Sequence, residues 1–341
     1  MTPFRLWFHY FMGGVVSSRS RVLVVLCVVL AALTGSVGTR AQVPVADGPG
    51  PQACDDPTNS VSLFAEELPG GRIGYGRSAG TAQVPGPTLE MTEGECLQVT
   101  LVNDTDKKLS MHAHGVAYTF ASDGTPHNQG CVAPGRAKTY VFNAPGPSTR
   151  ADGTIDPGTA GYWHYHDHCM GTNHGSGGVR SGLYGALIVR RAGDPEPDRK
   201  PVVLVMNQIT FNNKVAPRTP MPIVNMGERV EFVVIGHGDL FHTFHLHAHR
   251  WADNRSGIIT APSDSARLID NRTVGPADSF GFQVVAGEHV GPGAWMYHCH
   301  VQNHSDSGME GLFVVRTAGG EMTEQTKAAI RRWKRGTRHH G

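Results

Sequence analysis

Histidines spaced two residues apart are the most prominent chemical feature of the sequence. Four such pairs share no residue with one another: His112/His114, His166/His168, His245/His247 and His298/His300. Side chains i and i+2 of a strand point to the same side, about 6.6 Å apart, so each pair can aim two imidazoles at one point. Imidazole suits copper, zinc or iron. One isolated pair is more often two ordinary polar side chains, but four pairs predict a metal centre.

A single cysteine divides the last of these pairs. Cys299 lies between the two histidines, and further candidate ligands around it are His242, His304 and Met309. Two imidazoles, a thiolate and a weak thioether form the ligand set of an electron-transfer copper. A lone cysteine is otherwise often a small buried apolar residue. Its place inside a metal pair favours the ligand role.

The alternation of a strand gives this tripeptide a mechanism. The thiolate of Cys299 points to one face and the imidazoles of His298 and His300 point to the other. An electron that reaches a metal on the sulfur therefore has a covalent path, one residue long, to a second metal site. Single-electron collection is thereby joined to a cluster that can store the four electrons needed to reduce dioxygen to water. The sequence predicts a copper oxidase.

The elements that must position these ligands occur twice. Segments 94–102, 112–114, 165–168 and 182–190 recur as segments 227–234, 245–247, 297–300 and 308–316, at offsets of 133, 133, 132 and 126 residues. A pattern repeated in one order indicates repeated structure. The apolar segments are short, alternate with polar residues and are separated by Gly/Pro turns, which is typical of β-sandwiches. We expect an all-β protein with two Greek-key β-sandwich domains in tandem.

The repeat also sets the expected domain boundaries. Residues 1–41 are a predicted secretory signal, 42–191 the first domain, 192–200 a linker, 201–317 the second domain and 318–341 a tail that we expect to be a solvated extension. The leader has a basic flank and a twelve-residue apolar run at 22–33. A membrane-spanning helix needs about 20 apolar residues, so a cleaved signal fits better. We expect a secreted protein.

Charge and cysteine usage agree with export. Without the leader, 26 basic residues stand against 29 acidic ones, which argues against nucleic acid or an anionic membrane surface as the main partner. Besides Cys299 and Cys27 of the leader, the cysteines are Cys54, Cys96, Cys131 and Cys169. An even number in an exported chain predicts two disulfides. Three pairings remain open.

These residues resemble the multicopper oxidases, and most closely the two-domain bacterial small laccases. The resemblance covers residues 60–316, and its most specific stretches are 112–115, 161–168, 242–247 and 294–304. It implies two cupredoxin sandwiches and four copper ions per subunit.

The resemblance also implies a role for each ligand. The type 1 copper ligands are His242, Cys299, His304 and Met309. The type 2 copper ligands are His112 and His245. The type 3 ligands are His114, His166, His168, His247, His298 and His300. His164 and His249 lie on the same alternation as the ligand pairs, but the family pattern makes them non-ligands.

The repeat predicts that only the second domain holds a type 1 copper. The positions of the first repeat that match the type 1 ligands hold Leu109, Asp167, Thr172 and Leu183, so none of the four ligands is kept. This is the arrangement of the small laccases. Because the linker is short and small laccases are homotrimers, the resemblance implies a trimer with each copper cluster between neighbouring subunits.

Two further residues have weaker candidate roles. By position, Asp123 can relay protons near the cluster and Tyr118 can supply an electron. Asp123 lies in a Ser-Asp-Gly turn, where it is equally an ordinary turn residue. Tyr118 is equally an ordinary packing residue.

The leading functional hypothesis is a laccase-type enzyme, a benzenediol:oxygen oxidoreductase that oxidises phenols and aromatic amines with dioxygen. A Cu(I) or Fe(II) oxidase is the nearest alternative, but the sequence has no Met-rich segment and no obvious acidic cluster to recruit those ions. Copper nitrite reductases share the fold but keep type 1 copper in the first domain. A copper-binding protein without turnover gives no reason for a thiolate between two cluster ligands.

Overall fold

The computed structural model describes residues 59–337. The predicted signal and Cys54 lie outside this range. Within it, no helix is long and apolar enough to cross a membrane. Strands dominate, and the all-β expectation is confirmed.

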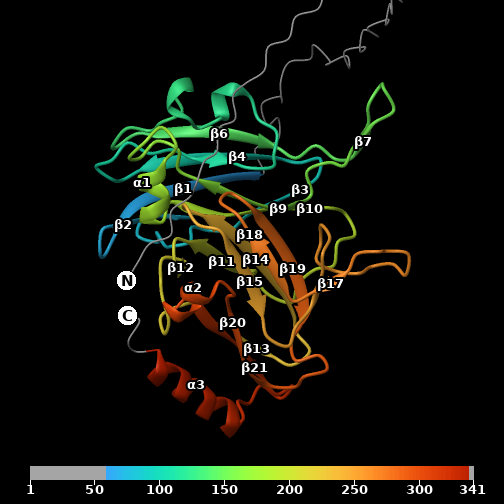
Figure 1. Cartoon of the computed structure of the whole chain (residues 1–341). Coiled ribbons are helices and arrows are strands. Elements are labelled where there is room, and N and C mark those ends of the chain that lie inside the picture. The colour runs from blue at the N-terminus through green and yellow to red at the C-terminus, as the bar shows by residue number, and fades with distance from the viewer. Residues whose placement is uncertain (1–58, 338–341) are drawn as a thin grey trace, which may run out of the picture. The chain divides into compact units, whose positions relative to one another are not determined.

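The first domain is a sandwich of two four-stranded sheets (Figure 1). One sheet has the order β2-β1-β4-β6, with β1 (Ser60–Leu68), β2 (Arg72–Gly76), β4 (Cys96–Asn103) and β6 (Ala137–Asn143). The other has the order β3-β10-β9-β5, with β3 (Leu89–Thr92), β5 (His112–Ala113), β9 (Gly161–His166) and β10 (Tyr184–Arg190). Strand β4 alternates in burial, and Leu97, Val99 and Leu101 point into the core between the sheets.

The second domain repeats this plan. One sheet has the order β12-β11-β14-β19, with β11 (Val202–Asn207), β12 (Thr210–Phe211), β14 (Arg229–His237) and β19 (Ser279–Val285). The other has the order β13-β21-β20-β15-β18, with β13 (Ile223–Asn225), β15 (His242–Leu246), β18 (Asn271–Val274), β20 (Gly293–Cys299) and β21 (Glu310–Arg316). Shorter elements are η2 (Phe120–Ser122), η3 (Pro126–Asn128), β7 (Ser148–Thr149), β8 (Ile155–Asp156), α1 (Ser176–Ser181), β16 (Trp251–Ala252), β17 (Leu268–Ile269) and α2 (Gln302–Asp306).

Strand pairing follows the sequence repeat. The parallel pairs β1–β4 and β3–β10 of the first domain correspond to β11–β14 and β13–β21 of the second. The antiparallel pairs β5–β9 and β9–β10 correspond to β15–β20 and β20–β21. In both domains, therefore, the His-x-His pairs lie on or directly after two neighbouring strands of one sheet.

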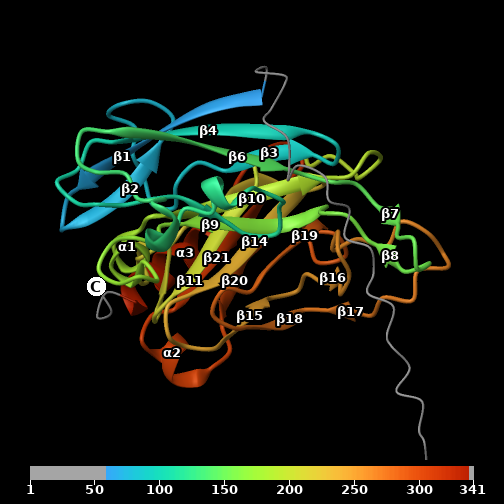
Figure 2. The ribbon, with the colours of Figure 1, turned by 90° about the horizontal axis from the view of Figure 1, so that it is seen from above.

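The two domains pack through a shared apolar seam. Strands β9 and β10 of the first domain lie against β11 and β14 of the second (Figures 1 and 2). Strand β14 is buried on both faces: Phe232 and Val234 enter the core of the second domain, whereas Val233 and Ile235 enter the seam. This explains why β14 is a nearly continuous apolar run.

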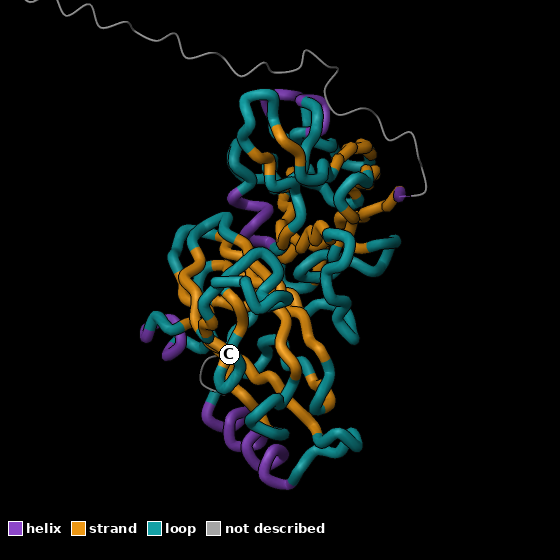
Figure 3. Tube along the Cα trace, turned by 90° about the vertical axis from the view of Figure 1, so that its right-hand side faces the viewer, coloured by secondary structure: helices purple, strands orange, loops and turns teal. Residues whose placement is uncertain are grey.

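The expectation of a solvated tail is wrong for its central part. Residues Glu324–Gly336 form helix α3, which packs on β20 and is the long purple helix near the bottom of Figure 3. Thr323 caps its N-terminus by accepting a hydrogen bond from the Thr326 amide. Trp333 Nε1 donates to Glu310 Oε1 at 2.9 Å. The basic run is interrupted every three or four residues by half-buried side chains, so one helical face can pack while the arginines face outward.

Candidate metal centres

The first predicted ligand group is closed and buried in the second domain. The donor atoms of His242, Cys299 and His304 all lie within 4.8 Å of one another. Cys299 Sγ is 3.8 Å from His242 Nδ1 and 3.6 Å from His304 Nδ1. These residues come from the start of β15, the end of β20 and helix α2. Met309 is fully buried in the same core cluster, and its carbonyl accepts a hydrogen bond from the Cys299 amide.

The electrostatics of this group suit a metal. Burial, together with repulsion from His304, lowers the pKa of His242 to about 4, and burial also lowers the pKa of His304. Both imidazoles are therefore neutral near pH 7 and keep a lone pair for coordination. Cys299 carries no disulfide. Two neutral imidazoles that face one buried sulfur fit the trigonal copper set predicted from the sequence.

The two predicted His-x-His pairs of the first domain, His112/His114 and His166/His168, form a second group. The donor atoms of His112, His114 and His166 lie within 4.8 Å of one another. Nε2 of His114 and Nε2 of His166 are 3.1 Å apart. The ring of His168 lies 5.2 Å from that of His112. Because β5 pairs with β9 in a register that sets His112 opposite His166, residues far apart in sequence converge here.

Backbone carbonyls orient three of these four rings. Nδ1 of His112 donates to the carbonyl of Asp123 at 2.6 Å, that of His166 to Asp167 at 2.7 Å and that of His168 to Asn173 at 2.7 Å. A ring that donates from Nδ1 presents the lone pair of Nε2, which is how metal-binding histidines are commonly fixed. Burial and neighbouring imidazoles lower the pKa of His114 to about 4. His114 is thus neutral near pH 7 and keeps a lone pair for a metal.

The two predicted His-x-His pairs of the second domain, His245/His247 and His298/His300, form a third group. The donor atoms of His245, His247 and His298 lie within 4.8 Å of one another, and the ring of His300 is 5.2 Å from that of His298. Nδ1 of His245 donates to the Asp270 carbonyl at 2.8 Å. Nδ1 of His298 donates to the Cys299 carbonyl, also at 2.8 Å.

We call His112, His114, His166 and His168 half-site A, and His245, His247, His298 and His300 half-site B. Across residues 59–337, no ring contact and no shared ligand group joins half-site A to half-site B. The structure therefore brings together each set of four histidines but does not bring the two sets together within one chain.

Asp123 and Tyr118 both lie beside half-site A. Asp123 Oδ1 is 3.5 Å from His112 Nδ1, and the Tyr118 ring is 6.0 Å from the His112 ring. Burial, followed by the negative charge of Asp123, raises the pKa of Tyr118. Thr125 Oγ1 donates to Asp123 Oδ2 at 2.5 Å. Their positions match the expectation, and their roles stay predictions.

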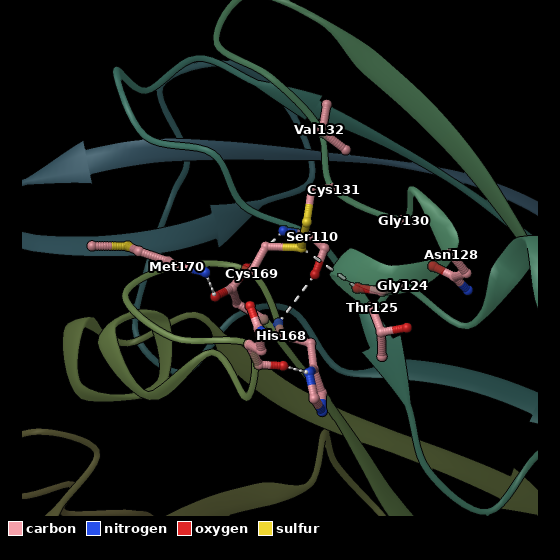
Figure 4. Close-up of a disulfide and its surroundings, with 12 residues drawn as sticks. Ser110, Gly124, Thr125, Asn128, Gly130, Cys131, Val132, His168, Cys169 and Met170 are labelled. Atoms are coloured by element: carbon pink, nitrogen blue, oxygen red, sulfur yellow. Dashed lines mark hydrogen bonds between the residues drawn. A yellow bond between two sulfur atoms is a disulfide. The ribbon is translucent and has the colours of Figure 1, made fainter.

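A disulfide braces half-site A (Figure 4). Cys131 is bonded to Cys169, which directly follows His168 in the chain. The amide of His168 donates to Ser110 Oγ at 3.0 Å. One of the three open pairings is thereby present. Cys96 is also disulfide-bonded.

The first-domain counterpart of the Cys299 group holds no metal ligands of that type. Leu109 and Leu183 are fully buried core residues, and Thr172 lies in an exposed loop. Asp167 is fully buried and accepts hydrogen bonds from the amides of Ser110 and Met170 at 2.6 and 2.7 Å. In the described residues, none of these four belongs to a candidate metal group.

One histidine at the site was not predicted from the sequence. His237, the last residue of β14, contacts the rings of His164 and His166. It belongs to no His-x-His pair, although it continues the alternation of Glu231, Val233 and Ile235 into the seam. His164 and His249, expected to be non-ligands, belong to none of the three groups.

Comparisons with known proteins agree with this architecture. Residues 79–194 and residues 195–319 match two sequence profiles, each described as multicopper oxidase. A probable nitrite reductase-hydroxylamine oxidoreductase fusion protein of Kuenenia stuttgartiensis is 32% identical over 71% of this chain, and Laccase-8 of Oryza sativa subsp. japonica is 38% identical over 33% of it. The aligned regions span only 28% and 18% of those relatives.

A solved structure described as a multicopper oxidase has 26% identity and a TM-score of 0.55, covering 75% of this chain and 87% of its own. The two profiles together cover all three ligand groups and both sandwiches, except for strands β1 and β2 of the first domain. The chain belongs to the multicopper oxidase family.

Proposed function

We propose that this protein is a laccase-type oxidase, which takes single electrons from phenols or aromatic amines and uses them to reduce dioxygen to water. The observation that carries the proposal is that the end of strand β20 lies between two candidate metal sites, the Cys299 group and half-site B. Cys299 faces His242 and His304, while its neighbours His298 and His300 belong to half-site B.

Bound copper would supply the redox chemistry, accepting single electrons at the Cys299 group and delivering them to dioxygen at the histidine cluster. The chain provides two short routes between these sites. One runs along the backbone from Cys299 to its flanking histidines. The other is the hydrogen bond from His298 Nδ1 to the Cys299 carbonyl at 2.8 Å. Both routes end on a ligand of the cluster, so no side chain needs to move between electron transfers.

Protons are proposed to reach the cluster through Asp123. Its side chain is about one-fifth exposed, at 19%, and lies 3.5 Å from the ring of His112. A carboxylate that contacts both solvent and a ligand can pass protons to the site where oxygen is reduced. Tyr118, close to both residues, is proposed to donate an electron.

The separation of the half-sites supports a homotrimer. Half-site A of one copy would face half-site B of the next, and three such contacts close a ring. Each cluster would then take its type 2 ligands, His112 and His245, from two copies. Adding the Cys299 group gives four copper ions per subunit. Export is proposed from the leader, and a cysteine pair in the first domain is typical of exported chains.

Nitrite reduction is the second candidate, because one relative is named as a probable nitrite reductase fusion protein. The buried Asp167 at the first-domain counterpart of Cys299, and the histidines on both sides of Cys299, favour the oxidase.

A copper count with an absorption spectrum, followed by turnover measurements, tests the proposal. We expect four coppers per chain, a thiolate band in the red and a near-ultraviolet shoulder from the coupled pair. Dioxygen uptake should depend on an added phenol. Nitrite-dependent turnover without oxygen uptake would replace the oxidase with a reductase, and Fe(II) or Cu(I) turnover a hundredfold faster than phenol turnover would indicate a metal-ion oxidase. A colourless copper-loaded protein would end the proposal.

The trimer has its own test. Sedimentation of the copper-loaded protein should give a mass of three chains, and dilution to monomers should remove the near-ultraviolet shoulder but keep the red band. A monomer that keeps both features would show that one chain completes the cluster.

A further inference from the structure

Strand β14 of the second domain presents one row of side chains to the first domain. Since side chains alternate along a strand, Glu231, Val233, Ile235 and His237 share the seam-facing side. Val233 and Ile235 belong to the apolar seam. The row therefore has two polar ends, Glu231 and His237, separated by apolar packing.

The facing strand, β9, carries a ligand in its own matching row. Tyr162, His164 and His166 alternate in the same way, and each contacts a seam-facing residue of β14. His166 is the last residue of β9 and a member of half-site A. Half-site A thus lies at one end of an interface between the two domains of a single chain.

The Glu231 end of the row is firmly held. Glu231 is fully buried and accepts hydrogen bonds from Arg190 Nη1 at 2.5 Å, Arg190 Nη2 at 2.7 Å and the Tyr162 hydroxyl at 2.8 Å. A buried charge with a bidentate partner holds a defined geometry. This network determines where β9 lies along β14.

The His237 end contacts the ligands. His237 is only 5% exposed, and its ring lies 4.9 Å from the ring of His164 and 5.2 Å from that of His166. His164 in turn stacks on His114 at 4.0 Å. Of the four histidines in half-site A, His114 alone has no carbonyl acceptor for its Nδ1 among residues 59–337. Its ring is instead in contact with two other rings, stacked on His164 and with its Nε2 3.1 Å from Nε2 of His166.

We propose that His237 is a positioning residue for half-site A: its ring holds His166 directly and His114 through His164, so the second domain of each chain shapes the metal site of its own first domain. This inference rests on the proposed copper cluster. Outer contacts that orient metal ligands typically change metal affinity by about 10-fold to 100-fold when removed. A loss in that range is expected at the cluster and not at the Cys299 group.

The test compares three variants of the full copper-loaded protein. His237→Ala removes the ring, His237→Phe restores a planar ring without nitrogens, and Val233→Ala removes volume from the same seam without contacting half-site A. Each variant is titrated with a copper chelator while the near-ultraviolet shoulder and the red thiolate band are followed separately. The red band serves as an internal control for the fold of the second domain.

We expect His237→Ala to lose the near-ultraviolet shoulder at a chelator concentration about 10-fold to 100-fold lower than the wild type does. The red band should be unchanged. His237→Phe should recover at least part of the difference, and Val233→Ala should match the wild type. A shoulder as resistant in His237→Ala as in the wild type would overturn the inference, as would an equal loss in Val233→Ala.

Two outcomes separate this inference from its foundation. If the wild type shows no shoulder, the proposed cluster fails and the inference fails with it, whereas a normal wild type with a normal His237→Ala overturns the inference alone. If His237→Ala also loses the red band, the test is repeated with His237→Leu, because leucine fills most of the space of the histidine without a planar ring. Loss of the red band in both would assign His237 to the fold of the second domain and refute the positioning role.

Discussion

The strand end at Cys299 and its counterpart at Asp167 occupy equivalent places in the two domains, but the two residues make different contacts. Each lies between two histidines of a half-site, at the end of the equivalent strand. Cys299 faces two imidazoles across 3.6 to 3.8 Å. Asp167 instead accepts hydrogen bonds from the amides of Ser110 and Met170. At equivalent positions, therefore, the second domain has a cysteine in a candidate metal group and the first domain has a carboxylate that ties the following turn by hydrogen bonds.

The His-x-His pairs are therefore repeated in both domains, whereas the Cys299 group is not. Both domains have four histidines close together, half-site A in the first domain and half-site B in the second. Among the described residues, only the second domain has a buried cysteine that is free of a disulfide. In the first domain, the equivalent positions hold core leucines and a hydrogen-bonded carboxylate.

Cys299→Ser should have the largest effect. The hydroxyl cannot act as a soft thiolate ligand, so the red band and phenol-dependent oxygen uptake should both disappear, whereas three coppers per chain should remain. Spectroscopy, a copper count and an oxygen electrode measure these outcomes. Retained oxygen uptake with phenol would contradict the single entry point.

The pH dependence of the copper-free protein should be the next largest effect. The pKa is about 4 for His242 and about 3 for His237, both below the ordinary value of 6.5. Because the unfolded chain binds these protons first, stability is fully present above pH 6.5 and is lost as the pH falls toward 4. Each tenfold difference in proton affinity between the folded and unfolded chain corresponds to about 1.4 kcal/mol. Denaturant unfolding at pH 7, 5.5 and 4.5 measures the loss.

In that series, copper-loaded protein serves as the control, since bound metal opposes the protonation of its ligands. A copper-free protein whose unfolding free energy does not change over this range would contradict the assignment of neutral, buried imidazoles.

Removing the Cys131–Cys169 disulfide should affect the first domain selectively. The double variant Cys131→Ala/Cys169→Ala should lose about 2–4 kcal/mol of unfolding free energy. Cys169 follows His168, so the near-ultraviolet shoulder should also become weaker. The red band should be unchanged, because all of the residues proposed to give it belong to the second domain. Equal loss of both spectral features would show that the disulfide stabilises the whole chain instead of half-site A.

Asp167→Asn should have the smallest effect. The amide oxygen can still accept one of the two backbone hydrogen bonds, but its NH2 group leaves the other amide without an acceptor, at a cost of about 1–3 kcal/mol. Thermal unfolding measures this cost. Asp167→Cys sharpens the comparison: it should produce no second red band, because Leu109, Thr172 and Leu183 cannot supply the other ligands.

Much of the site could be predicted from the sequence because its ligands come in short, rigid units. A His-x-His or His-Cys-His segment determines which side chains share a face, whatever surrounds it. The three donor groups, and the absence of His164 from them, agree with what such local patterns and the family resemblance predicted. The helix in the tail was missed because its packing face consists of a few half-buried residues between arginines.

The sequence by itself predicted the candidate ligands, the two-sandwich fold and the absence of the Cys299 pattern from the first repeat, because these depend on residue type and local alternation. Only the tertiary structure decided that half-sites A and B lie apart within one chain, that backbone carbonyls orient most of the rings, and that His237 reaches half-site A across the domain seam. These features depend on how separate strands pack in three dimensions, and local periodicity carries no record of that packing.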